Sequence, residues 1–498
     1  MTSERLTYTF GPIEQRGLFG PLRAGQIAWL SGGAVIAIVI LNQWPTAGGA
    51  VLGTVSFALA TALAVWPIGR RSVHEWMPVT ISYLARRAIR RTRFRSQAPA
   101  SGSRSRGLGS EHPVIVPLQP HPPRGLRGLR ITEVPYRGRP VGIVASRGER
   151  RLTAILACRV IAFSLLDADA QERRLARWSL VLSGAAGTSV RRIQWVERTA
   201  PAQGDELARW LATERDPAVP LRGTPMIESY LELISTTSRV SQDHEILLAV
   251  ELDARRVPER GRAAATVTLL EQTERIAQSL EAAEVRVLGA LTGPQVARAL
   301  RTAFDPYARA ELTALEAADA EHEGLAEAGA WPLGAEETWE HYRTDGAVHA
   351  TFWIGGWPRA GVSPMFMDAL LGSSGAVRTV AVTFEPLPIE RSTREVEAAI
   401  TRDQADRELR HRLGQSETAR QRQAQDAAVR RESELAAGHG EVRLAGFVTV
   451  SGRDADDLRR ACSQVHDQAA RARLELHRMY GQQAEAFTFT LPLCRGLR

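Results

Sequence analysis

Lysine is absent from this chain of 498 residues, in which all 63 basic residues are arginines. Without lysine there can be no Schiff base, no Ser/Lys dyad and no lysine in a phosphate-binding loop. The chain has no Gly-x-x-x-x-Gly-Lys motif, so the standard phosphate-loop ATPase activity is excluded. Cysteine is scarce too, with three widely spaced residues, and this spacing does not indicate a disulfide framework.

Charged residues are missing from one long stretch, the 46 residues between Arg23 and Arg70. A bilayer core about 30 Å thick needs about 20 apolar residues per helix, so this stretch is long enough for two spans and a tight turn. We predict the spans near residues 25–41 and 48–68 of a transmembrane hairpin that occupies residues 1–72. The polar and helix-breaking residues from Asn42 to Pro45 are typical of the turn.

Arginines flank the hairpin on both outer sides, whereas its turn carries no charge. The positive-inside rule therefore predicts a two-pass protein of the cell (inner) membrane with both termini in the cytoplasm. We expect tryptophan and arginine side chains near the span ends to anchor the hairpin, the arginines by attracting anionic lipid at about 1 kcal/mol each. The predicted anchoring residues are Trp29, Trp44, Trp66, Arg70, Arg71, Arg86, Arg87, Arg90 and Arg91.

Small residues recur along the second span, beginning with Gly49 and Gly53, and a parallel row of them runs from Ala50 to Ala62. Such a surface allows two helices to approach each other closely. The sequence leaves two interpretations of Gly49 and Gly53 open. They would serve either the packing of the hairpin against itself or its packing against another membrane subunit.

Basic charge is concentrated near the hairpin: residues 1–150 hold 20 arginines and 6 acidic residues, whereas the remainder holds 43 arginines and 49 acidic residues. We predict an amphipathic juxtamembrane segment with a basic end at residues 73–95 and a flexible linker rich in Pro, Gly, Ser and Arg at 96–128. Because the part beyond is slightly acidic, we expect the basic part to contact anionic lipid and do not expect direct contact with nucleic acid.

From residue 129 onward the pattern is that of a folded α+β protein. We predict a first α+β unit over residues 129–307 and a second over 331–498, separated by an acidic, alanine-rich linker at 308–330. The irregular alternation of strands and helices favours an antiparallel or mixed sheet that helices cover on one side. Both units are expected to be cytoplasmic, and the highly charged residues 391–436 to form a long exposed helical insertion in the second unit.

Individual elements follow from the alternation of apolar and polar residues. Strands are predicted at 129–136, 140–146, 151–158 and 161–166, and a helix after them that Asp167 would cap. Near the end of the chain a strand is predicted at 441–450, a helix at 454–479 and a strand at 484–491. The last three elements would form a β-α-β unit.

Few groups of residues in the sequence have the spacing of a catalytic or metal-binding site. Cys462 and His466 lie four residues apart on a predicted helix, a spacing that suits two metal ligands, but Cys462 falls on the apolar stripe of that helix and is expected to be buried. His341 and His349 flank a turn without a second ligand pair nearby. No His-Glu-x-x-His, Cys-x-x-Cys or Gly-x-Ser-x-Gly motif occurs. We therefore assign no catalytic, metal-binding or cofactor-binding residue.

Several stretches resemble parts of type IV secretion machines. The non-motor N-terminal domain of the conjugation ATPases is similar to FSLLD at Phe163–Asp167, to RLARWSLVLSGAAGTSVRRIQWVER at Arg174–Arg198, and to the late stretches GFVTVSGRDADDLRRA and AFTFTLPL. The N-terminal hairpin resembles the small two-span subunit of the same machines, the PrgI-like or VirB-type inner-membrane protein that often occurs fused to that ATPase. The combined resemblance points to high-GC Gram-positive bacteria.

In that family the strand that resembles residues 484–491 leads into the motor domain, whereas this chain ends at Arg498. The resemblance implies a non-catalytic inner-membrane scaffold of a conjugation or type IV-like secretion apparatus. Its partners would be a separate motor ATPase and other membrane subunits of a multi-subunit assembly, and no cofactor is implied. Two alternatives are a membrane subunit of a type VII secretion system and a membrane-bound enzyme with an unrecognised site.

Overall fold

The computed structural model describes most of the chain. Apart from single positions, the described ranges are 24–68, 71–96, 122–159, 163–201, 242–308, 327–358, 361–372, 375–388, 390–398 and 440–497, with a few isolated residues between them. The predicted linkers and the predicted helical insertion at 391–436 lie largely outside these ranges. The chain divides into two compact units: one holds the apolar helices, and the other holds a large sheet.

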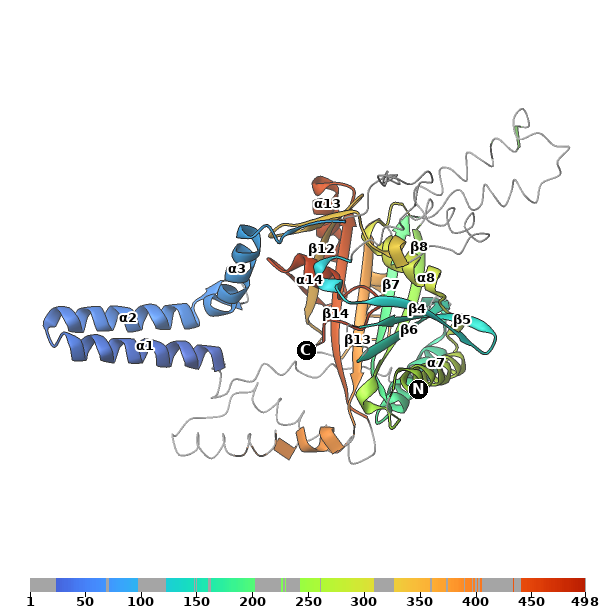
Figure 1. Cartoon of the computed structure of the whole chain (residues 1–498), viewed down its shortest axis with the longest axis horizontal. Coiled ribbons are helices and arrows are strands. Elements are labelled where there is room, and N and C mark those ends of the chain that lie inside the picture. The colour runs from blue at the N-terminus through green and yellow to red at the C-terminus, as the bar shows by residue number, and fades with distance from the viewer. Residues whose placement is uncertain are drawn as a thin grey trace, which may run out of the picture. The chain divides into compact units, whose positions relative to one another are not determined.

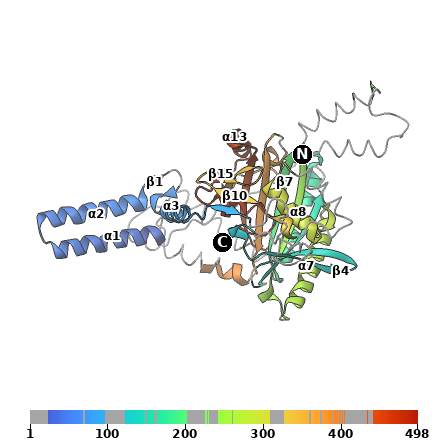
Figure 2. The same ribbon diagram turned by 45° about the horizontal axis from the view of Figure 1, so that its top comes forward.

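Two apolar helices, α1 (Ala24–Gln43) and α2 (Ala47–Val65), lie side by side as a hairpin in every view (Figures 1 and 2). Each is long and apolar enough to cross a membrane, as the absence of charged residues between Arg23 and Arg70 predicted. The second helix begins where the Thr46 hydroxyl accepts a hydrogen bond of 3.3 Å from the N–H of Gly49, which caps its first turn. It ends three residues before the predicted limit, because Pro67 has no N–H to continue it.

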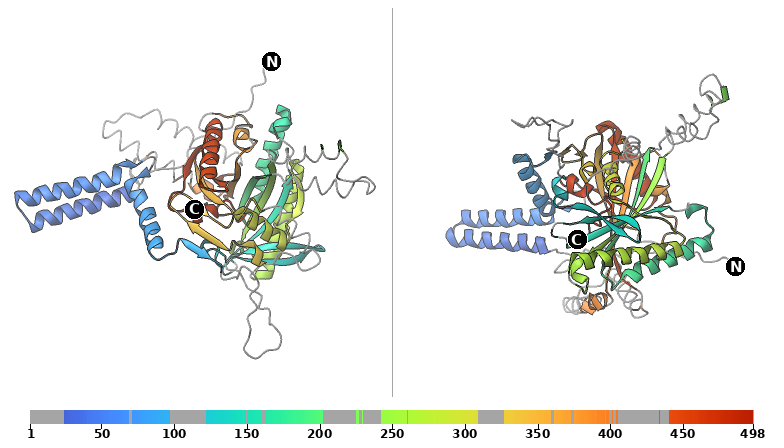
Figure 3. Two further views of the ribbon diagram at one scale, coloured as in Figure 1. Left: turned by 90° about the horizontal axis from the view of Figure 1, so that it is seen from above. Right: turned by 45° about the vertical axis from the view of Figure 1, so that its right-hand side comes forward.

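The predicted juxtamembrane segment forms helix α3 (Val73–Ala88), which follows a short pair of strands, β1 (Pro67–Ile68) and β2 (Arg71–Ser72). This helix lies at the open end of the hairpin and turns away from the direction of α1 and α2 (Figures 1 and 3). Val79 and Tyr83, one turn apart, are buried. The amphipathic pattern of the sequence thus corresponds to a helix with one buried side.

The other unit is built on a 13-stranded sheet in which the described neighbours are antiparallel. Its central strands run side by side in Figure 1. Across the sheet the order is β3 (Arg93–Arg95), β10 (Gly334–Glu337), β11 (Tyr342–Arg343), β12 (Val348–Gly356), β14 (Val442–Gly452), β13 (Val377–Pro386), β7 (Val190–Pro201), β8 (Gln242–Asp253), β6 (Arg151–Arg159), β5 (Arg139–Ala145) and β4 (Arg130–Tyr136), with β15 (Glu475–Arg478) beside β12 and β9 (Arg286–Ala290) beside β6.

Six α-helices accompany the described strands. They are α4 (Ala168–Ala185), α7 (Arg262–Ala282), α8 (Gly293–Phe304), α10 (Asp368–Leu371), α13 (Ala455–Arg471) and α14 (Gln483–Phe487). Three of the longer ones begin at side-chain caps: Asp167 before α4, Thr292 before α8 and Asp454 before α13. The predicted cap at Asp167 is confirmed, since its carboxylate accepts a hydrogen bond of 2.7 Å from the N–H of Ala170.

The sheet contains the same topology twice. In the first half the neighbouring strands are β9-β6-β8-β7, with α4 between β6 and β7 and α7 between β8 and β9. In the second half they are β15-β12-β14-β13, with α10 and α13 in the corresponding connections. A hairpin precedes the first strand of each half, β4 with β5 and β10 with β11, and a helix follows the last, α8 and α14. The two predicted α+β units are therefore two copies of one arrangement.

These two halves share a single sheet, because β7 pairs with β13 from Thr199 opposite Arg378 to Ile193 opposite Phe384. Both halves, which the sequence predicts as two α+β units on either side of residues 308–330, belong to one compact unit. Alternation of residues indicates a strand but not its distant neighbour, so the sequence could not reveal this pairing.

Helices lie on both faces of the sheet, which corrects the prediction of a one-sided arrangement. Alternate residues of β6 and β8 pack into two hydrophobic clusters on opposite faces of the sheet. One cluster contains residues of α4 and α7, which lie against the sheet in Figure 3. The other contains residues of α8 together with Phe487 and Leu491. A third cluster packs α10 and α13 against the second half. The core therefore consists of two layers, with the sheet between them.

Three predicted elements near chain turns differ from the structure in type or length. Residues 163–165 of the predicted strand 161–166 form a 3-10 helix, η3 (Phe163–Leu165). The predicted helix 454–479 ends at Arg471, where Arg473 adopts φ 56°, and the following residues form β15. The predicted strand 484–491 begins with α14, and its threonines bond backward, from the Thr488 hydroxyl to the Glu485 carbonyl and from Thr490 to Phe487.

Candidate functional site

The residues predicted to anchor the hairpin lie at its surface where the structure describes them. Trp44 in the turn and Trp66 after α2 are 62% and 65% exposed, and Trp29 on α1 is half-buried. Arg70 lies outside the described residues, as does the side chain of Arg71.

The end of α3 combines apolar and basic side chains. Ile81, Leu84 and Ile89 are 59%, 54% and 57% exposed, although they are large hydrophobic residues. Among the predicted anchors, Arg87, Arg90 and Arg91 are exposed beside them, and Arg86 donates a hydrogen bond of 3.3 Å to the Ser82 carbonyl. Exposed apolar and basic groups on one short helix are typical of an interfacial helix.

Gly53 faces the first helix of the hairpin, and Gly49 faces Trp44 in the turn. A Cβ atom on Gly53 would lie 3.3 Å from the Ala37 carbonyl oxygen, and one on Gly49 would lie 1.9 Å from that of Trp44. On the facing side a Cβ atom on Gly33 would lie 2.4 Å from the Ala60 Cβ. Close contact within the hairpin at these glycines is compatible with its packing against itself, and packing against another membrane subunit stays a prediction.

The residues considered as metal ligands have ordinary structural surroundings. Burial raises the pKa of Cys462 to about 11, and His466 packs edge-on against the Phe352 ring at 5.0 Å between centroids. His349 is fully buried between the Ser451 hydroxyl at 2.8 Å and the Thr344 hydroxyl at 3.0 Å, and burial lowers its pKa to about 4. Among the described residues no group of three or more His, Cys, Asp or Glu side chains could hold a metal ion.

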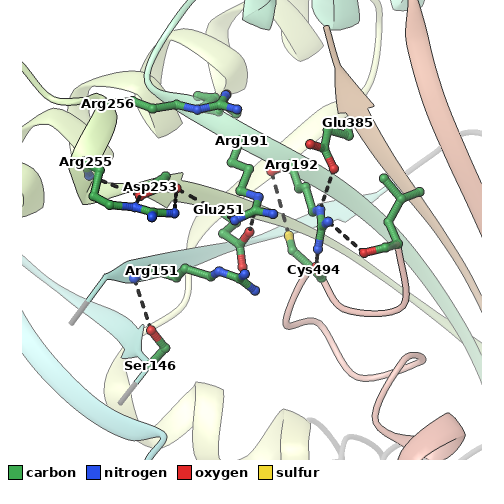
Figure 4. A network of polar contacts seen from close by, with 12 residues as sticks. Ser146, Arg151, Arg191, Arg192, Glu251, Asp253, Arg255, Arg256, Glu385 and Cys494 are labelled. Carbon is green, nitrogen blue, oxygen red and sulfur yellow. Dashed lines mark hydrogen bonds and ion pairs between the residues drawn. The ribbon is translucent and has the colours of Figure 1, made fainter. Parts of the chain in front are cut away.

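A group of arginines, some buried and some exposed, lies at one end of the first half of the sheet (Figure 4). We call it the arginine cluster: Arg151 at the start of β6, Arg191 and Arg192 near the start of β7, Arg255 in the turn η4 (Ala254–Arg256), and Arg495 in the last residues of the chain. Three carboxylates lie among them, those of Glu251, Asp253 and Glu385.

A β-bulge explains how two consecutive arginines reach this place. The ladder between β7 and β8 shifts its register between Val190 and Arg192, so the strand bends at Arg191. The Arg191 guanidinium then lies near the carboxylates of β8, at 3.8 Å from Glu251 and 3.7 Å from Asp253. Arg192 instead reaches across to Glu385 on β13, with 3.0 Å between Nε and Oε2.

Arg192 and Gln194 hold the last residues of the chain on the sheet. The Arg192 guanidinium donates to the carbonyls of Cys494 at 3.3 Å and Leu497 at 2.7 Å. The Gln194 amide donates to the Phe489 carbonyl and accepts from the N–H groups of two residues, Leu493 and Cys494. Because β7 and β13 both contribute to this contact, the closing segment lies over the junction of the two halves.

The other members of the arginine cluster are less fully satisfied. Arg191 Nε and Glu251 Oε1 are buried, and neither atom has a hydrogen-bond partner in the part of the chain that the structure describes. Burial, together with the charges of Arg151 and Arg192, lowers the pKa of Arg191. Burial also raises the pKa of Glu251 to about 7, although the neighbouring guanidinium groups oppose this effect.

The arginine cluster is better suited to non-covalent binding than to covalent catalysis. Its one thiol, Cys494, is fully buried, and burial raises the pKa of that thiol well above its usual value. Sequence reasoning missed the cluster altogether. The available signal was the Arg191-Arg192 pair inside an otherwise alternating strand, together with Glu251 and Asp253 at the end of another.

Comparisons with known proteins give no family assignment. No protein-family model matches the chain, and a search of curated proteins found no match. The resemblance to type IV secretion proteins described above stays a prediction.

Proposed function

We propose that this chain is a non-catalytic membrane scaffold of a conjugation or type IV-like secretion apparatus and that it docks a separate motor ATPase. The observation that carries the proposal is the direct succession of two apolar helices and an α+β sheet unit, because this joins an anchor to a large folded body. The absence of lysine supports a separate motor, since this chain has no phosphate-loop lysine of its own.

Membrane anchoring is the first part of the proposal. Apolar side chains that would face lipid are exposed along the hairpin, for example Ile38 at 64% and Val51 at 65%. With α1 and α2 in the bilayer, α3 would lie at the cytoplasmic interface, with Ile81 and Leu84 among the headgroups and its arginines near anionic lipid.

The proposed topology is open to a direct test by cysteine labelling. A Pro45→Cys variant places a thiol in the hairpin turn, and an Arg90→Cys variant places one after α3. In intact cells a membrane-impermeant maleimide should label the turn variant and spare the Arg90 variant until the membrane is opened. Labelling of both variants or of neither in intact cells would refute a two-span hairpin with cytoplasmic ends.

The scaffold role is tested by purifying the full chain from detergent-solubilised membranes. We expect a motor ATPase to purify with it, the chain alone to hydrolyse no ATP, and deletion of its gene to stop transfer of the transported substrate. The proposal fails if no ATPase accompanies the chain and transfer continues after deletion.

A further inference from the structure

The repeated topology supplies an internal comparison for the arginine cluster. In the first half Arg151 lies opposite Asp253, and Thr153 opposite Glu251. At the corresponding end of the second half, His349 lies opposite Ser451 and Thr351 opposite Thr449. Those side chains pair as neutral groups, at 2.8 Å from His349 Nδ1 to the Ser451 hydroxyl and 2.8 Å between the two threonine hydroxyls. The fold can therefore be built without charges at this place.

The charges of the cluster do not balance. Its five arginines face the carboxylates of Glu251, Asp253 and Glu385, and Glu485 acts on Arg495 as well, which leaves one positive charge in excess with every carboxylate ionised. Arg192 is committed to Glu385, and Arg255 holds Asp253 through two contacts of 3.1 and 3.0 Å. The excess charge therefore belongs to Arg151, Arg191 and Arg495, which lie around Glu251, with Asp253 near Arg191 and Glu485 near Arg495.

Free donors accompany this excess charge. The Arg151 side chain is exposed and makes no hydrogen bond or close ion pair with any described residue, and the buried Arg191 Nε has no acceptor. The Arg495 guanidinium donates one hydrogen bond of 2.6 Å to the Gly125 carbonyl. Burial lowers the pKa of Arg191 and of Arg495, and the charge of Arg151 lowers both further, although nearby carboxylates oppose this effect.

We propose that the arginine cluster binds a divalent oxyanion of the phosphate type, either free or as the phosphoryl group of a small molecule. Guanidinium groups match the oxygens of such an anion with paired N–H donors, and the positive charge that the carboxylates leave in excess favours an anion at this place. Arg151 and Arg191 would contact the anion, while Arg192 and Arg255 keep their carboxylate partners. Glu251 faces the same space, and in its neutral form its carboxyl group can donate to the anion.

The test uses the full chain in detergent and calorimetric titration at constant ionic strength with inorganic phosphate, pyrophosphate and adenosine monophosphate. We expect saturable binding of at least one of them at one site per chain. Arg151→Gln should weaken it by at least about tenfold, because one charge-assisted contact is lost. Arg460→Gln, which changes an exposed arginine of α13, should leave the affinity unchanged and serves as the matched control.

The Arg151 side chain is exposed and makes no hydrogen bond with a described residue, although its charge acts on Glu251, so the unfolding temperature of each variant without ligand checks that its replacement leaves the fold intact. Tighter binding of adenosine monophosphate than of phosphate would identify a nucleotide as the source of the phosphoryl group, whereas equal affinities would identify the free anion. The proposal is overturned if none of the three anions binds at 10 mM, roughly the weakest affinity of interest. It is also overturned if Arg151→Gln and Arg460→Gln bind with the same affinity.

Discussion

Replacing Arg192 with methionine should destabilise the sheet unit strongly. The side chain is 5% exposed, and its loss would leave the buried Glu385 without its cation and the carbonyls of Cys494 and Leu497 without their donor. Removing one partner of a buried ion pair typically costs about 3 to 5 kcal/mol. At about 2 to 4 °C per kcal/mol, the unfolding temperature should fall by roughly 6 to 20 °C.

The assay is thermal unfolding of the full chain in detergent, followed through tryptophan fluorescence, since Trp195 lies on the same strand. A double variant, Arg192→Met with Glu385→Leu, removes both charges and should recover about 2 kcal/mol of the loss, because no charge remains buried alone. The two carbonyls stay unpaired in the double variant, so recovery should be incomplete. A fall below about 2 °C for the single variant, or equal losses in both variants, would refute this account of the contact.

Three other outcomes follow from burial. The pKa of His349 is lowered to about 4, so the folded protein favours the neutral imidazole. We therefore expect the free energy of unfolding to fall as the pH drops from about 6.5 to 4. A His349→Gln variant should flatten this pH dependence in urea titrations. Gly33→Val should force α1 and α2 apart and lower the unfolding temperature in detergent, whereas Gly32→Val, with open space around it, should not; equal effects would contradict the packing. Cys158 and Cys494 are buried with raised pKa values, so maleimide should label them only after unfolding, whereas the half-buried Cys462 should react slowly in the folded protein.

The sequence predicted the elements whose causes are local. The absence of charged residues between Arg23 and Arg70 located both apolar helices. Asp167 was recognised as a cap because capping depends on the next few residues alone.

Features that depend on distant residues were not predictable in the same way. The threonines of residues 484–491 alternate with apolar residues as in a strand, yet contacts with remote groups, such as that of the Ala484 N–H with Glu337, favour a helix. The arginine cluster joins residues more than 300 positions apart, such as Arg192 and Leu497, and no local pattern relates them. The duplication was hidden because the two halves share their topology without sharing these side chains.

The pairing of β7 with β13 also determines how the chain can be divided. Each of these strands would be the open edge of its own half, and an exposed edge with unpaired N–H and carbonyl groups invites association with other chains. Each half therefore shields the edge that the other would expose. A cut within residues 308–330 should yield two fragments that aggregate when made separately and recombine when made together, as the halves of a split reporter do.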